Sequence, residues 1–383
     1  MHAIVIGAGI GGLATAGALR SHGHEVTVIE RSATIESIGA GISIFANGFR
    51  ALDELGAADS LRHPVDPSLR TLQRTPRGGV LAELPRDPSL EFGVMHRADL
   101  QRALLERTAG ARLLHGVGAR VHGASGAVTA QPAADPSAAG ELLSGDLVVI
   151  ADGIRSRNRA AVTAEPGARY SGYSAWRAVT RHPVDLSDAA GETWGFRERF
   201  GFAPLPDGRV YWFGVASLPE GTRFEDEFAE VRRRFEAWHA PIPALLDATD
   251  PASVLRHDIH ELARPLHTFT RGRCVLVGDA AHAMTPDLGQ GGGQALEDAA
   301  TLGNLVAEAA DLDAALDAYD RLRRPRTQSI ARRARSMGRM AHVGWRPAAA
   351  LRDAAIRMTP ASVLARAAAG LGEWEPPTRL VSA

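Results

Sequence analysis

The chain has 383 residues, of which 45% are hydrophobic, and its 43 basic residues nearly balance its 44 acidic ones. This length is too great for one simple core, so we expect two domains. The formal net charge of -1 gives no field to attract nucleic acid or an anionic membrane, and neither is expected as a partner. The single Cys274 excludes a disulfide framework and any cysteine-based metal centre, and no metal site is expected.

The chain begins directly with an apolar, strand-like run, and arginines and prolines interrupt its longest apolar stretches. We therefore expect neither a signal peptide nor a membrane span. The cysteine usage fits a reducing compartment, so the expected location is cytoplasmic.

The N-terminal residues are typical of a strand, a glycine-rich loop, a helix and a second strand. They are Ala3–Ile6, Gly7–Gly12, an alanine- and leucine-rich stretch to Ser21, and Val26–Glu30. In such a unit Gly7 allows the tight turn, Gly9 lets the backbone approach a pyrophosphate, and Gly12 permits close helix packing. Glu30, at the end of the second strand, would hold a ribose hydroxyl. The pattern predicts a dinucleotide site but does not separate FAD from NAD.

Two further strand ends favour a flavin. Asp146–Ile150 leads into Asp152 and Gly153, and Arg273–Val277 leads into Gly278 and Asp279. Each pair places an acid and a glycine at the carboxyl end of a strand, where doubly wound folds bind ligands. The loop 286–293 then opens another helix, whose free N–H groups would stabilise the negative charge that a reduced flavin ring develops. We therefore expect an FAD site.

With these motifs together, the chain resembles the FAD-dependent aromatic hydroxylases of the para-hydroxybenzoate hydroxylase type, which are single-component class A flavoprotein monooxygenases. The resemblance covers nearly the whole chain and extends to FAD-dependent urate and salicylate hydroxylases. It rests on the glycine fingerprint with Glu30 and Arg31, on Gly39–Ile42 with Asn47 and Gly48, on Arg97 with Leu100, on Asp152 with Gly153, and on Gly278 with Asp279 and the loop 286–293. It implies an α/β fold: a Rossmann-like FAD-binding domain with an inserted, mostly β substrate domain and C-terminal helices.

The resemblance also implies the residues that bind FAD. They are Gly7, Gly9, Gly12, Glu30, Arg31, Gly41, Arg97, Val121, Asp152, Asp279, Pro286, Gly289 and Gly291. Glu30 and Arg31 would contact the adenosine half, Arg97 the central part of FAD, Asp279 the ribityl chain, and Gly289 and Gly291 the edge of the flavin ring. Asp152 would serve both FAD and the nicotinamide cofactor.

The activity implied by this family is hydroxylation of an aromatic or heteroaromatic small molecule through a flavin C4a-hydroperoxide. O2 and either NADH or NADPH would be the co-substrates. A second glycine fingerprint is missing from the sequence, so we expect NADH or NADPH to dock transiently.

The expected domains are discontinuous. Residues 1–70, 94–168 and 266–340 would form the FAD-binding domain, residues 71–93 and 169–265 the substrate-binding β-sheet domain, and residues 341–383 a C-terminal helical segment. The reason is a change of pattern after about Tyr170, where short alternating aromatic runs replace helical periodicity. Pro206–Gly208 would join two of these strands in a hairpin. One face of the hairpin would pack on the FAD domain while the other roofs an apolar cavity.

Arg199 and Tyr211 are the candidate catalytic residues. Arg199 precedes an alternating run and, by resemblance, matches an arginine on the pocket-lining strand of urate hydroxylases. The competing interpretation of Arg199 is an arginine on a surface strand, and that of Tyr211 is an aromatic residue half-buried in a sheet. Arg177 and His257 are further polar candidates, and His282 is expected to be a packed scaffold residue.

The arginine-rich stretch 321–335 is interpreted as a helix with a solvated charged face that kinks or restarts at Pro325. Residues 346–371 are predicted to form further helix packed on the FAD domain. The sequence leaves open a flavin epoxidase, a non-aromatic hydroxylase and a non-catalytic FAD-binding accessory protein. It also leaves open the substrate, the oxygenated position, the choice of NADH or NADPH, any catalytic base and the oligomeric state.

Overall fold

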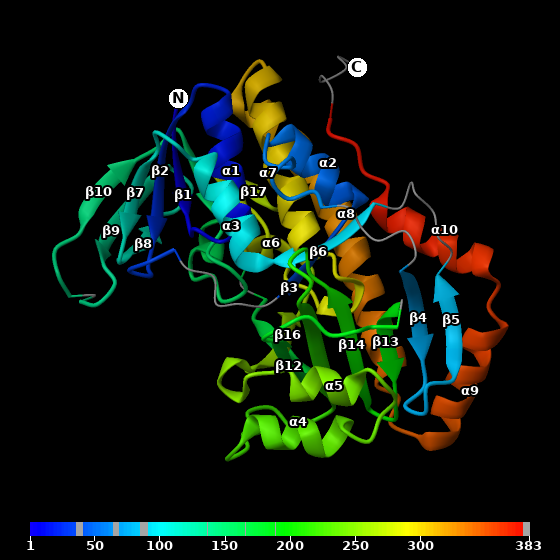
Figure 1. Ribbon diagram of the computed structural model, residues 1–383. Helices are drawn as coiled ribbons and strands as arrows, with labels where there is room; N and C mark the ends of the chain where they lie inside the picture. The colour runs from blue at the N-terminus through cyan, green and yellow to red at the C-terminus, as the bar shows by residue number, and fades with distance from the viewer. Residues whose placement is uncertain are drawn as a thin grey trace.

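The computed structural model describes residues 1–35, 41–63, 69–84, 91–135, 137–164, 166–187 and 189–377. Gly39 and Ala40 of the predicted motif lie outside these residues, whereas Gly41 lies within them. Figure 1 shows a helix-covered sheet in the upper left, a second large sheet below it, and the C-terminal helices along one side.

The first large sheet has six strands in the order β17-β18-β11-β1-β2-β7. Its strands are β1 (His2–Ile6), β2 (Glu25–Glu30), β7 (Arg112–His115), β11 (Leu147–Ile150), β17 (Thr270–Arg271) and β18 (Cys274–Leu276). All neighbours pair in parallel except β17 with β18. The central strands are continuous apolar runs that are buried, as expected for a sheet covered on both faces. Their carboxyl ends meet at one edge, which brings the three glycine-marked loops together.

Helices cover this sheet and connect its strands. They are α1 (Ile10–Ser21), α2 (Ala46–Glu54), α3 (Arg97–Glu106), α6 (Asp279–His282), α7 (Gly291–Glu308) and α8 (Leu312–Ala341), with short 3-10 turns η1 (Asn158–Ala161) and η3 (Pro286–Leu288). A three-stranded sheet, β8 (Val117–Val121), β9 (Ala127–Pro132) and β10 (Glu141–Ser144), lies beside β2. The predicted α/β class with a Rossmann-like sheet is confirmed.

The second large sheet has seven strands in the order β16-β12-β15-β14-β13-β4-β5. They are β4 (Arg70–Arg74), β5 (Val80–Leu84), β12 (Ala168–Val179), β13 (Ala189–Trp194), β14 (Glu198–Pro204), β15 (Val210–Ala216) and β16 (Leu255–Leu262). The predicted hairpin is confirmed, because β14 and β15 pair as far as Pro204 with Val210. Phe92 does not join this sheet: it starts β6 (Phe92–His96), which pairs with β3 (Gly41–Phe45).

One hairpin face packs towards the FAD domain as predicted, but the prediction that the other face roofs an apolar cavity is wrong. Phe200, Phe202 and Trp212 face away from the six-stranded sheet and form a separate core under α4 (Glu227–Phe235) and α5 (Ile242–Asp247), with η2 (Pro251–Ser253) beyond. These large aromatic side chains need cover, and the two helices supply it. In Figure 1 these helices lie on the lower side of the sheet. The opposite face therefore both packs towards the glycine-marked loops and carries the polar candidates.

Helix α8 runs without interruption through Pro325, so of the two predicted alternatives, a kink or a restart, the restart does not occur. The solvated-face interpretation holds at Arg321 and Arg332 but is wrong at Arg323, which is 1% exposed. Two carboxylates on α7 give Arg323 a reason to be buried. The tail is helical as predicted, but the predicted packing on the FAD domain is wrong for α9 (Arg346–Met358), which packs against β5 of the seven-stranded sheet. α10 (Ala361–Gly372) contacts both β5 and α2. Across the described residues, every helix is too short or too polar to cross a membrane.

Candidate functional site

The first glycine loop has the shape expected of a nucleotide loop. Gly7 has φ +101°, and a Cβ there would lie 2.5 Å from the carbonyl oxygen of Ala151. A Cβ at Gly12 would lie 1.9 Å from the Gly7 carbonyl oxygen. Gly9 differs, because no described atom lies within 4 Å of its Cβ position. Gly7 and Gly12 therefore permit close packing, while Gly9 leaves open space at the start of α1.

Glu30 is tied to the same loop. Its Oε2 accepts a hydrogen bond from the Ala8 backbone N at 2.7 Å, and its Oε1 accepts one from the Ser32 N at 2.8 Å. Arg31, the next residue, is exposed. The carboxylate thus fixes the loop that it borders, and its partly exposed oxygens remain beside the open space at Gly9.

The second strand end contains an unsatisfied acid. Asp152 Oδ2 accepts a hydrogen bond from Asn158 Nδ2 at 2.9 Å, but its buried Oδ1 has no partner among the described residues. Asn158 also accepts a hydrogen bond from the Val121 backbone N at 3.0 Å, which joins two of the predicted residues. Buried polar atoms are rarely left unpaired, so Asp152 Oδ1 indicates a missing polar partner. Sequence reasoning missed Asn158, whose only signal is its place just after the strand-end motif.

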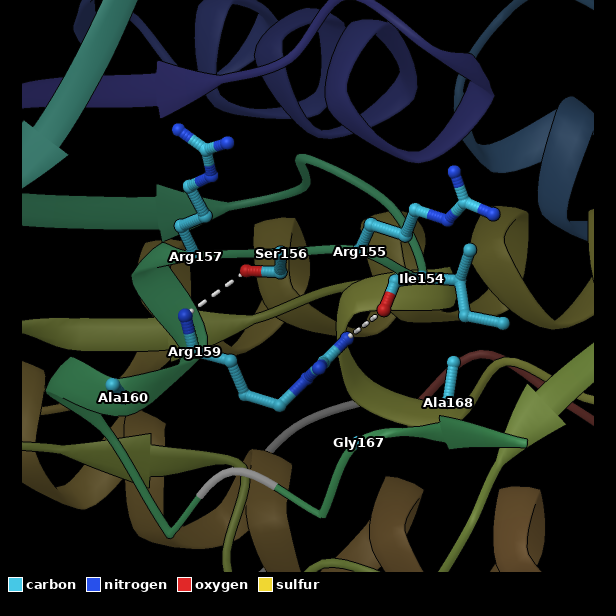
Figure 2. A pocket seen from close by; sticks show the side chains of 8 residues that line it. All are labelled: Ile154, Arg155, Ser156, Arg157, Arg159, Ala160, Gly167 and Ala168. Carbon is cyan, nitrogen blue, oxygen red and sulfur yellow. Dashed lines mark hydrogen bonds between the residues drawn. The ribbon is translucent and has the colours of Figure 1, made fainter.

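A hollow of about 400 Å³ follows this motif, lined by Ile154–Arg157, Arg159, Ala160, Gly167 and Ala168 (Figure 2). Arg159 is 1% exposed and donates to the carbonyl oxygens of Ala280 at 2.6 Å and Ile154 at 2.8 Å. Figure 2 shows Arg155 and Arg157 pointing to the other side of the loop. Arg159 therefore holds the second and third strand ends together.

The third strand end is held by an acid of α7. Gly278 has φ +62°, and its N donates to Asp298 Oδ2 at 2.9 Å. The same oxygen lies 2.6 Å from His282 Nε2, and His282 is 3% exposed. This confirms the prediction that His282 is a packed scaffold residue. Asp279 is exposed at the start of α6, on the open side of the turn.

A buried charge network, which the sequence did not reveal, connects this turn to the loop before α7. Arg323 pairs with Glu297 and, through Nε at 2.6 Å, with Asp298. Burial works to raise the pKa of Glu297, but Arg323 and Arg326 hold it below its ordinary value. Glu297 also accepts a hydrogen bond from Asn47 Nδ2 at 2.6 Å, and Asn47 donates to Gln290 Oε1 at 3.0 Å. One arginine thus supports both loops.

The loop before α7 presents open backbone. Pro286 is exposed, and Gly289 has φ +63° with its Cβ position 3.0 Å from the Phe45 ring. Gly291 begins α7, and no described atom lies within 4 Å of its Cβ position. The N–H groups at this helix start are therefore available to an electron-rich ligand.

Arg199 lies on the face of the seven-stranded sheet that meets this loop. It is 2% exposed and pairs with Asp287 of η3 and, at 3.4 Å, with Glu192. Tyr173 also donates to Asp287, at 2.5 Å. Burial opposes its charge, yet the carboxylates of Glu192 and Asp287 hold the pKa of Arg199 above its ordinary value. Arg199 is thus anchored to the loop, and its Nε has no partner among the described residues.

Tyr211 lies against the backbone of Gly41, where a Cβ would be 2.4 Å from the ring Cγ. Burial raises the pKa of Tyr211, and the cation of Arg177 acts against that rise. Arg97, exposed at the start of α3, also lies within electrostatic range of the phenol. Burial and the same two arginines lower the pKa of His257. The structure therefore brings Gly41 and Arg97 next to the polar candidates of the sheet.

The site combines side chains from two sheets. Its side chains belong to three loops of one sheet and one face of another, with acids, arginines and aromatic rings interleaved. Within the described parts of the chain, no three His, Cys, Asp or Glu side chains gather closely enough to hold a metal ion.

Comparisons with known proteins agree with this geometry. The family model described as FAD binding domain matches residues 1–334. The aurachin C monooxygenase/isomerase of Stigmatella aurantiaca is 38% identical over 331 residues, which is 84% of each protein. The FAD-dependent urate hydroxylase of Klebsiella pneumoniae is 35% identical, over 89% of this chain and 91% of that protein. The crystal structure of Klebsiella pneumoniae HpxO complexed with FAD and uric acid superposes with a TM-score of 0.85 at 30% identity, over 97% of this chain and 96% of that one.

Proposed function

Because the chain belongs to the FAD binding domain family and is an FAD-dependent monooxygenase, we propose that it hydroxylates an aromatic or heteroaromatic small molecule. NADH or NADPH and O2 would be its co-substrates. The observation that carries the proposal is the ion pair between Arg199 of the aromatic sheet face and Asp287 of the loop before α7. This contact joins the sheet face that carries Arg199 and Tyr211 to the loop expected to border the flavin, which supports a substrate site between them.

The described residues fit FAD. Gly9 and Gly291 leave open space beside two helix N-termini, and Asp152 Oδ1 is a buried acceptor that no described residue contacts with a hydrogen bond. We infer that the backbone N–H groups of Gly9–Gly12 bind the diphosphate and that Gly291 borders the flavin ring. Bound FAD would supply electron transfer from the nicotinamide cofactor and the activation of O2.

The protein's own side chains would orient the substrate and exclude water. Tyr211 is 7% exposed, and its raised pKa keeps the phenol protonated at neutral pH, so it can donate a hydrogen bond to a substrate oxygen. Arg199, held by Asp287, would fix the polar end of the substrate relative to the flavin loop. The urate hydroxylase and the uric acid complex of HpxO support a heteroaromatic substrate for this face.

The test is anaerobic reduction of the FAD-loaded protein by NADH and by NADPH, with and without a panel of aromatic compounds. Faster bleaching of the flavin absorbance with one compound is expected, followed in air by a hydroxylated product that carries oxygen from isotopically labelled O2. The faster of the two cofactors identifies the physiological one. Steady oxidation of NADH or NADPH without any organic product would contradict the proposal and favour an accessory role.

A further inference from the structure

One register row of the seven-stranded sheet carries opposite charges at its two ends. Glu192 pairs with Gly201, Gly201 with Phe213, and Phe213 with Arg177. Directly paired residues point to the same face, and here it is the face that carries Arg199 and meets the flavin loops. Three strand spacings put the backbones of Glu192 and Arg177 about 14 Å apart. They form no ion pair with each other among the described residues.

The middle of the row is a flat apolar platform. A Cβ at Gly201 would lie 2.2 Å from Phe213 Cζ, so the Phe213 ring lies directly over the glycine backbone. Arg199 lies 6.0 Å from this ring, and the Tyr211 ring centroid lies 6.2 Å from it. Any side chain at position 201 would displace the ring. The row therefore presents an aromatic surface between an anion and a cation.

Among the residues that the structure describes, one carboxylate oxygen of Glu192 has no hydrogen-bond donor. Its Oε2 accepts hydrogen bonds from Trp194 Nε1 at 2.9 Å and Arg199 Nη1 at 3.4 Å, whereas Oε1 accepts none from the part of the chain that is described. The side chain is 32% exposed. Its negative charge reaches both Arg199 and Tyr211, which places it among the candidate substrate residues. A donor on a bound ligand would find Oε1 unoccupied.

Arg177 supplies the complementary cation. No described carboxylate forms an ion pair with it, and its charge acts on Tyr211 and His257, which face the same side. Both neighbours are neutral near pH 7, because the pKa of Tyr211 is raised and that of His257 is lowered. The guanidinium donates a hydrogen bond to the Tyr211 phenol, and its other N–H groups remain available to an electron-rich oxygen.

We propose that this row binds a planar heteroaromatic substrate that carries a ring N–H at one edge and a carbonyl or enolate oxygen at the opposite edge. The N–H donates to Glu192, the oxygen accepts from Arg177, and the ring lies on Phe213. This inference rests on the proposed function, and it names the substrate class as cyclic vinylogous amides and lactams rather than simple phenols. Glu192 and Arg177 are then substrate-binding residues that determine specificity.

The test compares 4(1H)-quinolone with its N-methyl analogue, using the change in flavin absorbance of the FAD-loaded protein to measure each dissociation constant. The wild-type protein should favour the N–H compound by about tenfold or more, because a hydrogen bond to a charged group is lost on methylation. Glu192→Ala should abolish the preference. Glu192→Gln keeps an uncharged acceptor oxygen and should retain part of it. Glu141→Gln, on β10, is the matched control and should retain all of it.

The other end of the row is tested with quinoline, which lacks the carbonyl oxygen and also the ring N–H. The wild-type protein should favour 4(1H)-quinolone over quinoline by about tenfold or more, since the oxygen pairs with a cation. Arg177→Met should reduce this preference to the part that the ring N–H contributes through Glu192, without changing the effect of N-methylation. Arg120→Met, an exposed arginine of β8, is the control.

Equal binding of the N–H and N-methyl compounds by the wild-type protein would overturn the inference. So would an equal loss of affinity for both compounds in Glu192→Ala, because a purely structural role would have that effect. If either result appears while another aromatic compound is hydroxylated, the proposed function stands and only the substrate class fails. If no aromatic compound accelerates flavin reduction, the proposed function fails as well. The FAD content of each variant reports whether it is folded.

Discussion

At the residue scale, the glycines of the first loop are of two kinds. Two of them occupy positions with no room for a Cβ, whereas the third borders open space. The Cβ positions of Gly7 and Gly12 fall on backbone oxygens, whereas that of Gly9 points into open space. Only the first two are required by the packing of the protein itself. The same sequence motif therefore combines a structural requirement with a binding requirement.

Gly12→Ala is expected to weaken FAD binding by about tenfold or more, because the added methyl collides with the Gly7 carbonyl and shifts the loop. Overpacking of this kind should also lower the free energy of unfolding by about 1–3 kcal/mol. Fluorescence titration with FAD and chemical denaturation measure the two effects. Gly344→Ala, where no described atom lies within 4 Å of the Cβ position, is the control. Wild-type affinity in Gly12→Ala would contradict the argument.

Arg199→Met should lower the free energy of unfolding by about 3 kcal/mol or more, because it leaves the Asp287 carboxylate buried without its cation. Adding Asp287→Asn should recover part of the loss, since the second substitution removes the stranded charge. Denaturant unfolding of the two single variants and the double variant gives the coupling energy. If the loss in the double variant equals the sum of the two single losses, Arg199 and Asp287 do not stabilise each other and the argument fails.

At the element scale, the contact between α7 and α8 holds two loops of the site in position. Glu297 and Asp298 are neighbours on α7, yet one supports the loop before the helix and the other the Gly278 turn. Arg323 of α8 neutralises both carboxylates. The Gly278 turn and the loop before α7 are therefore both supported by one buried cation, Arg323 of α8.

Arg323→Met should lower the free energy of unfolding by about 3–5 kcal/mol, because the buried Asp298 loses its arginine and the buried Glu297 keeps only Arg326. It should also weaken FAD binding, since Gly278 and Gln290 lose their supports. Thermal unfolding with and without FAD separates the two effects. Arg321→Met, two residues earlier on the exposed face of α8, should change neither. Similar behaviour of the two variants would rule out the proposed support.

At the scale of the whole molecule, one source of the loss of stability in acid lies where the seven-stranded sheet meets the end of α8. His342 stacks on Tyr173 with ring centroids 4.3 Å apart. Burial, followed by the Arg199 cation, lowers the pKa of His342 from 6.5 to about 3. In the unfolded chain the imidazole takes up a proton below pH 6.5, whereas in the folded protein it does not. Its contribution to stability is therefore fully present above that pH and is lost as the pH falls.

The free energy of unfolding should fall by about 1.4 kcal/mol per pH unit through this group over the window between its two pKa values. His342→Phe keeps a ring against Tyr173 and removes the titrating group. The variant should therefore lose stability less steeply with acid in this window, whatever its stability at neutral pH. Denaturant unfolding at a series of pH values measures the slope. Identical slopes for the two proteins would contradict the assignment.

The local parts of the fold could be predicted from the sequence, and the long-range pairs could not. Each glycine loop follows its own strand within a few residues, so β1, β11 and β18 could be located by pattern. The pairing of Arg199 with Asp287 spans 88 residues, and that of Arg159 with Ala280 spans 121. Periodicity contains no information about such pairs. The same limit explains the error over Arg323, whose two carboxylates lie on another helix.

One face of the hairpin was misassigned for a related reason. Alternation identifies two faces but not what covers each of them. The cover of Phe200 and Trp212 comes from α4 and α5, which follow the hairpin in the chain. The predicted FAD-binding residues and the two candidate catalytic residues remain predictions, now with defined neighbours.

The strand order of the six-stranded sheet has a consequence for how the protein is made. β11 pairs with β1 on one side and with β18 on the other, and β18 has been synthesised only when the chain reaches Leu276. Until then a newly synthesised chain exposes an apolar strand with unpaired backbone groups, a form that invites aggregation. Every strand of the seven-stranded sheet has been synthesised by Leu262. During synthesis the seven-stranded sheet can therefore assemble before the six-stranded sheet, although the six-stranded sheet begins at residue 2.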